Sequence, residues 1–204
     1  MEDVLDLYAE AYDPQRPVVC FDELPVQLLA EVNEPLPAEP GKPKRQDYEY
    51  ERKGHCSLFI AFEPLTGQRQ VTVRERRTNA DFAQQMQQLV ASYPEAELIR
   101  VVLDNLSTHT PAALYQTFAA EEARRLTQKL EFHYTPKHGS WLNMAEIEWS
   151  VLSRQALKGR LPEIAAVEDR INPWQAERNQ RRATVNWCFS TTHARAKLAR
   201  LYPH

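Results

Sequence analysis

The sequence predicts an α/β domain whose central sheet is mixed and carries helices on its faces. Short apolar runs typical of buried strands lie at 18–21, 55–62, 98–103 and 130–134, and an alternating run lies at 70–74. The first three strands in chain order form a meander, and helices alternate with strands afterwards. That order predicts a mixed sheet rather than a purely parallel or antiparallel one.

Proline and glycine mark the boundaries of the predicted helices and strands. Pro14 and Pro17 end a helix predicted over 2–12, and a strand over 18–23 follows. Five prolines and a polar run predict an irregular segment over 24–54. A hairpin turn is expected at 63–67. The expected helices span 79–93, with Asn79 as the N-cap, 110–122 and 140–152, and further helices are expected in the tail.

Composition excludes several classes of protein. The chain has 204 residues, of which 43% are hydrophobic and 26% charged, as is ordinary for one globular domain. It has no apolar run long enough for a membrane span and no signal-peptide pattern. Its three cysteines, Cys20, Cys56 and Cys188, are far apart. This predicts a reduced, cytoplasmic protein rather than a disulfide scaffold or a zinc site.

Charge is distributed unevenly. Residues 1–41 hold ten acidic residues and one arginine, whereas residues 150–204 hold ten Lys/Arg and four acidic residues. The basic C-terminal quarter is either a phosphate-contacting surface or a solvated helical face. The basic patch at 42–53, with Tyr48 and Tyr50, is likewise either a nucleic-acid contact or an ordinary polar loop.

Three carboxylates are the candidate chemical groups. Asp22 and Asp104 each end an apolar strand, and neighbouring parallel strands end side by side at the crevice edge of an open α/β sheet. Counted from Leu142 at helical spacing, Glu146 lies on the apolar face of the 140–152 helix and Glu148 faces elsewhere. Like charges brought together need a cation, and ligation by oxygen alone favours Mg²⁺ or Mn²⁺. Two such ions about 3.5–4 Å apart suit phosphoryl transfer.

The chain resembles the catalytic domain of mariner-type insertion-sequence transposases of bacteria, in the DDE superfamily. Four segments carry the likeness: 18–23 (VVCFDE), 101–109 (VVLDNLSTH), 135–152 (TPKHGSWLNMAEIEWSVL) and the tail from 186 to 201. The resemblance implies a ribonuclease H-like fold, that is, a five-stranded mixed sheet with flanking helices and a C-terminal helical extension. The chain departs from the family in two places. The 41 residues between Asp104 and Glu146 are more than in the tightest mariner spacing, and Met144-Ala145 stands where Pro-Ile is common.

Carried over residue by residue, the resemblance makes Asp22, Asp104 and Glu146 both the catalytic and the metal-binding residues, with two Mg²⁺ or Mn²⁺ ions as cofactors. Four further polar residues are expected to orient the site or touch DNA: Asn105, His109, His138 and Asn143. For Asn105 and His109, a structural cap of the next helix is the alternative. The expected phosphate contacts are Lys42, Lys44, Arg45, Arg52, Lys53, Arg74, Arg76, Arg77, Arg181 and Arg182.

The implied activity is metal-dependent DNA cleavage and strand transfer, with DNA ends and target DNA as partners. The alternatives are a nuclease of the same fold that does not join ends, and an idle DNA-binding relic. A homodimer is expected because two ends must meet. The chain is read as one catalytic domain over 1–204, divided at 1–16, 17–155 and 156–204. The family's N-terminal helix-turn-helix is not seen, so a separate polypeptide or a frameshift fusion is expected to supply it.

Overall fold

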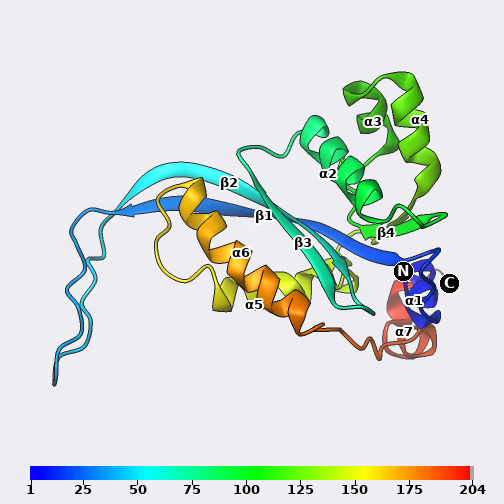
Figure 1. Ribbon diagram of the computed structural model, residues 1–204. Helices are drawn as coiled ribbons and strands as arrows, with labels where there is room; N and C mark the ends of the chain where they lie inside the picture. The colour runs from blue at the N-terminus through cyan, green and yellow to red at the C-terminus, as the bar shows by residue number, and fades with distance from the viewer. Residues whose placement is uncertain (203–204) are drawn as a thin grey trace.

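A five-stranded mixed sheet forms the centre of the protein in the computed structural model (Figure 1). The strands are β1 (Val18–Glu31), β2 (Tyr50–Glu63), β3 (Gln68–Arg74), β4 (Ile99–Leu103) and β5 (Leu130–Tyr134), in the order β3-β2-β1-β4-β5. The β1/β2 and β2/β3 pairs are antiparallel, and the β1/β4 and β4/β5 pairs are parallel. The predicted mixed sheet is therefore confirmed. The structure describes residues 1–202 without the side chain of Leu201, so the end of the expected 156–204 extension lies outside it.

The first two strands continue beyond the sheet as a long hairpin arm (Figure 1). They pair from Cys20 opposite Phe62 out to Glu31 opposite Tyr50. The prediction of an irregular segment over 24–54 is therefore wrong for much of its length, and only residues 32–49 lie between the two strands. Pro25 is tolerated in β1 because β4 pairs only with residues 18–20, which leaves the other edge of β1 free beyond them.

Helices cover both faces of the sheet. Side chains alternate along each strand, so Cys20 and Val102 belong to one apolar cluster while Phe21 and Leu103 belong to the other. The first cluster lies under α1 (Glu2–Ala9), α5 (Ala145–Gln155), α6 (Ile164–Gln180) and α7 (Thr191–Lys197). The second lies under α2 (Asn79–Ser92), α3 (Pro111–Thr117) and α4 (Ala120–Lys129). Short 3₁₀ turns occupy Ser140–Leu142 and Ala199–Leu201.

Three helix predictions need correction. The helix expected over 110–122 is two helices, α3 and α4, because Phe118 and Ala119 have extended backbone angles between them. The N-cap of α2 is Thr78 rather than Asn79, and Thr78 forms a capping box with Asp81. The helix expected over 140–152 is a 3₁₀ turn followed by α5, which begins only at Ala145.

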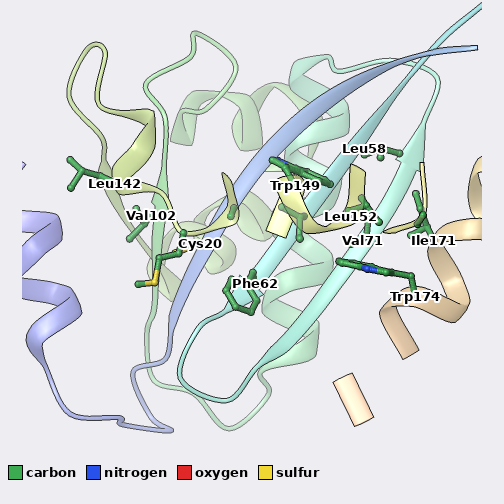
Figure 2. Packing of buried hydrophobic residues seen from close by; sticks show 14 of the residues in the cluster. Cys20, Leu58, Phe62, Val71, Val102, Leu142, Trp149, Leu152, Ile171 and Trp174 are labelled. Atoms are coloured by element: carbon green, nitrogen blue, oxygen red, sulfur yellow. The ribbon is translucent and has the colours of Figure 1, made fainter. Parts of the chain in front are cut away.

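Helix α6 lies along the edge strand β3. Figure 2 shows Ile171 and Trp174 of α6 near Val71 of β3. The side chains of Gln175 and Asn179, one helical turn apart, hydrogen-bond the β3 backbone at Val71 and Arg69. These bonds satisfy backbone groups that an edge strand otherwise leaves open to another chain. Among the described helices, none has the length and apolar character needed to cross a membrane.

Candidate active site

The register of β1 and β4 places Asp22 next to Asp104, the residue that follows β4. Cys20 is paired with Val102, and each aspartate follows its strand's member of that pair by two residues. Because side chains two apart along a strand share a face, Asp22 projects toward the layer that contains α5. Asp104 follows the last residue of β4, and its carboxylate lies 2.6 Å from His109. Adjacent strands lie about 4.8 Å apart, which brings the two carboxyl groups into one neighbourhood.

Asp22 is the most electrostatically perturbed of the three candidate carboxylates. Burial raises the pKa of its carboxyl from the ordinary 3.8 to about 7, and the negative charges of Glu146 and Asp104 add to the rise. The nearby Glu23 backbone and Trp149 side chain act in the opposite direction and lower the pKa of Asp22. The charges of Glu146 and Asp104 both affect Asp22, which indicates that the three predicted carboxylates lie in one neighbourhood.

The start of α5 is fixed to β1 next to Asp22. The side-chain amide of the buried Asn143 donates to the Phe21 carbonyl at 2.8 Å, and its oxygen accepts from the Ala145 backbone N–H at 3.2 Å. The Tyr8 hydroxyl donates to the Leu142 carbonyl at 2.8 Å. These bonds hold the first turn of α5, where Glu146 lies, beside the strand that carries Asp22. Asn143 therefore sets the spacing between two of the candidate ligands.

The predicted orientations of Glu146 and Glu148 are reversed in the structure. Glu146 is exposed, whereas the Glu148 side chain is fully buried. Helical spacing counted from Ala145, where α5 begins, gives a buried stripe at i, i+3, i+4 and i+7 that includes Glu148, Trp149 and Leu152. The prediction counted from Leu142, which belongs to the preceding 3₁₀ turn, and so assigned the wrong glutamate to the apolar face.

Glu148 is neutralised by two arginines that sequence reasoning missed. Its Oε2 lies 2.9 Å from Nε of the fully buried Arg69, and its Oε1 lies 2.7 Å from a terminal guanidinium nitrogen of Arg178. Burial lowers the pKa of Arg69 to about 10, although Glu148 opposes the shift. The cluster joins β3, α5 and α6. Sequence offers little signal for it, because the partners are 79 and 30 positions from Glu148.

His109 lies behind Asp104 and is fully buried. Its Nδ1 is 2.6 Å from Asp104 Oδ1, and its Nε2 is 3.1 Å from Oε1 of Glu23. Burial on its own lowers the pKa of His109, but the hydrogen bonds to Asp104 and Glu23 outweigh burial and raise it to about 9. The ring is therefore protonated at neutral pH. Glu23 was not among the predicted site residues, although it directly follows Asp22 in the sequence.

The sequence profile of the DDE superfamily endonuclease family matches residues 17–168, about three quarters of the chain. The chain belongs to this family. The matched segment contains Asp22, Asp104 and Glu146. Comparison with curated protein sequences gives no significant match.

Solved structures share the fold of this chain. The Mos1 mariner paired-end complex with Mn superposes with a TM-score of 0.59 at 18% identity, over 88% of this chain and 55% of that chain. The Mos1 transposase paired-end complex with the left transposon end has a TM-score of 0.59 at 16% identity, over 89% of this chain and 57% of that one. The expected fold is confirmed. The chain spans little more than half the length of these relatives.

The remaining predicted site residues lie in different surroundings. Asn105 is exposed just after β4. His138 is exposed in the loop before α5 and has a φ of 62°, a conformation uncommon outside glycine. Thus His109 and Asn143 contact the carboxylate site through named bonds, whereas Asn105 and His138 lie on the surface of the loops that follow β4 and β5.

The predicted phosphate contacts are spread over three regions. Lys42, Lys44 and Arg45 lie exposed at the tip of the arm, and Arg52 and Lys53 lie on its second strand. Arg74, Arg76 and Arg77 lie at the end of β3 and just after it, where Arg77 is 4.0 Å from Glu23. Arg181, paired with Glu177 at 2.6 Å, and Arg182 follow α6. Of these residues, Arg77 is thus the one whose measured contact links it to the candidate site.

The donor set of the site suits a hard divalent cation. Its three candidate ligands are carboxylates, the oxygen donors that Mg²⁺ and Mn²⁺ favour. The buried, repelled carboxyl of Asp22 is the kind of group that a cation stabilises in its charged form. Within residues 1–202, however, no three His, Cys, Asp or Glu side chains are gathered at metal-holding spacing. The three carboxylates thus share a neighbourhood without being drawn together as ligands.

Proposed function

We propose that this DDE endonuclease cleaves DNA strands and joins the freed 3′ ends to target DNA. The observation that carries the proposal is the carboxylate cluster around Asp22. There, burial and two neighbouring carboxylates raise the pKa of Asp22 to about 7, and no arginine or lysine contact to Asp22 balances them in the described structure. A site with excess buried negative charge is suited to binding a cation.

Asp22, Asp104 and Glu146 are the residues that would hold the divalent ions. When bound, two such ions supply an activated water or 3′-hydroxyl and stabilise the charge that develops on the phosphate. One Mos1 paired-end complex is a complex with Mn and another is a complex with Mg, which supports the choice of metal. The share of the protein chain is to position the ligands and the DNA.

Each candidate metal ligand is positioned by a different part of the fold. Asp104 is backed by the protonated His109. Glu146 is carried on the first turn of α5, which Asn143 ties to β1. Asp22 belongs to the strand itself. A site built on strands and a helix is held more precisely than one on loops, which suits in-line attack on a phosphate.

DNA is the proposed substrate and main partner. The exposed lysines and arginines of the arm, of the loop after β3 and of the end of α6 are proposed to contact phosphates, which give affinity without sequence information. The proposal also includes a homodimer and a helix-turn-helix part that a separate polypeptide or a fusion supplies to read the ends. The similar Mos1 structures are paired-end complexes, which supports the pairing of two ends.

Incubation of the chain with plasmid DNA and Mn²⁺, followed by sequencing of the products, tests the proposal. We expect nicked and joined products from the wild type. Asp22→Asn, Asp104→Asn and Glu146→Gln should each abolish them while leaving the circular dichroism spectrum unchanged. Glu121→Gln, an exposed change on α4, is the matched control and should stay active.

Three other outcomes have definite meanings. Free nicks without joined ends would instead identify a nuclease of the same fold. No cleavage by the wild type, with no Mn²⁺ binding that depends on Asp22, would identify an idle relic. Full activity in one of the three carboxylate variants would remove that residue from the site.

A further inference from the structure

Consecutive carboxylates on β1 point to opposite faces of the sheet. Asp22 faces α5, whereas Glu23 projects to the α2 side, where its side chain is 4% exposed. A buried carboxylate needs a partner. The Oε1 atom of Glu23 accepts a hydrogen bond from Nε2 of His109 at 3.1 Å. The nearest arginine, Arg77, is more than half exposed and its guanidinium lies 4.0 Å from the other carboxylate oxygen. Glu23 is therefore directed at His109.

His109 in turn is directed at Asp104. Its Nδ1 lies 2.6 Å from Asp104 Oδ1 and 3.2 Å from the Asp104 carbonyl oxygen. The ring is held by aromatic neighbours, with its centroid 4.8 Å from that of Phe82 and 5.7 Å from that of Phe21. Its own backbone carbonyl accepts from the Tyr134 hydroxyl at 2.8 Å. The imidazole is thus fixed in place and orientation.

We propose that Glu23 is a positioning residue for the metal site and that it acts through His109 on Asp104. Glu23 accepts from Nε2–H, so that the opposite ring nitrogen, Nδ1, is held against Asp104, 2.6 Å from its Oδ1 and 3.2 Å from its carbonyl oxygen, and limits the movement of the carboxylate that would meet a divalent cation. This inference rests on the proposed function. Groups that orient a metal ligand commonly contribute tenfold to a hundredfold to metal affinity. Asp22 and Glu23 would then serve one site from opposite faces of the sheet.

A second histidine provides a matched control. His133 also bridges two carboxylates, with Nδ1 2.9 Å from Asp3 and Nε2 2.8 Å from Glu131. Neither carboxylate is a candidate metal ligand. If a carboxylate–imidazole pair served stability alone, the variants Glu23→Gln and Glu131→Gln should have the same effect on metal binding.

A double-mutant cycle on Mn²⁺ affinity, measured by calorimetry on the full chain, tests the proposal. We expect Glu23→Gln to weaken Mn²⁺ binding about tenfold, and Glu131→Gln to leave it within twofold. In a His109→Gln background, Glu23→Gln should weaken Mn²⁺ binding by less than a further twofold, because the imidazole that connects Glu23 to Asp104 is already absent. Unchanged affinity in Glu23→Gln, or an equal loss in both backgrounds, would overturn the proposal.

A measurement on the wild type alone covers the case in which a variant fails to fold. In nitrogen-15 NMR of the wild type, Mg²⁺ should shift the ring-nitrogen signals of His109 while the signals of His133 stay in place. His109 signals that do not respond to Mg²⁺ would contradict the proposal. Asp22-dependent Mn²⁺ binding that ignores Glu23 would overturn this inference and leave the proposed function intact. A chain with no Asp22-dependent binding would overturn both.

Discussion

Helix α5 borders two groups of acidic side chains that differ in how their charge is balanced. Glu148, on the buried stripe, is paired with Arg69 and Arg178. The Asp22, Asp104 and Glu146 group, at the start of the same helix, has His109 on Asp104 as its cationic contact. In the first group the chain supplies its own cations, and the resulting ion pairs connect β3, α5 and α6. In the second it leaves negative charge for a ligand to balance.

Whether nearby cations balance an acidic side chain separates structural carboxylates from functional ones better than the depth of burial does. Glu148 is the more deeply buried of the two α5 glutamates, yet its surroundings are complete, with two guanidinium groups and the Phe62 and Trp174 rings beside them. Asp22 is less buried, and its surroundings raise its pKa because they oppose its charge. Perturbed groups of this second kind are the ones that mark functional sites.

Removing the balanced glutamate should have the largest effect on stability. Glu148→Ala leaves two arginines without their carboxylate, one of them fully buried. We expect a loss of about 3–5 kcal/mol in the free energy of unfolding. Urea denaturation measures it. Glu146→Ala, two residues away and exposed, is the control and should change stability by less than about 0.5 kcal/mol. Equal losses of stability in the two variants would contradict the claim that Glu148 balances buried arginines whereas Glu146 contributes little to stability.

The unbalanced group should make stability depend on pH. The folded-state pKa of Asp22 is raised from 3.8 to about 7, so the folded chain holds this proton more tightly than the unfolded chain. Its contribution is fully present below about pH 4 and is lost as pH rises through 7. Asp22→Asn should remove this loss, so above pH 7 the variant should be more stable than the wild type by up to about 4 kcal/mol.

Denaturation curves of the wild type and Asp22→Asn between pH 4 and 8 measure the effect. The difference between the two chains should shrink toward acid pH, because Asp22 is then protonated and uncharged in the wild type. A difference that is constant across this range would show that Asp22 has an ordinary pKa, and the second group would then be no different from a solvated surface cluster.

Removing the hydrogen bond from Asn143 to the Phe21 carbonyl, which holds Glu146 beside Asp22, should have a smaller effect on stability. Asn143→Ala leaves the Phe21 carbonyl without its side-chain donor and frees the start of α5. We expect a loss of about 1–3 kcal/mol in unfolding free energy, together with weaker Mn²⁺ binding, because Glu146 is no longer held beside Asp22. Calorimetry with Mn²⁺ checks the second part. Unchanged Mn²⁺ affinity would limit Asn143 to a structural role.

Sequence patterns predicted the strands better than the arm between them. The runs before Asp22 and Asp104 are short and apolar, so both could be located as buried strands, although β1 continues past Asp22 to Glu31 whereas β4 ends just before Asp104. The arm could not be predicted, because its prolines indicate irregular chain and Pro25 is accommodated only where β1 has left β4. Strand pairing at that distance from the core depends on the partner strand, which the local sequence does not specify.

The orientations of Glu146 and Glu148 within α5 were predicted the wrong way round for a local reason. Helical spacing is informative only inside one helix, and the chain changes from a 3₁₀ turn to an α-helix between Leu142 and Ala145. The partners of Glu148 and Glu23 were missed because they are remote in sequence. Arg69 and His109 approach these acids only after the sheet has assembled.

The central claim is that the Asp22 group is completed by a cation from outside the chain. Titration of the Asp22 carboxyl by carbon-13 NMR, with and without Mg²⁺, tests it most directly. The account predicts a midpoint of about 7 in the metal-free chain that falls by more than one pH unit when Mg²⁺ is added, and no such fall in Asp104→Asn. A midpoint near 4 without metal, or one that Mg²⁺ leaves unchanged, would contradict it.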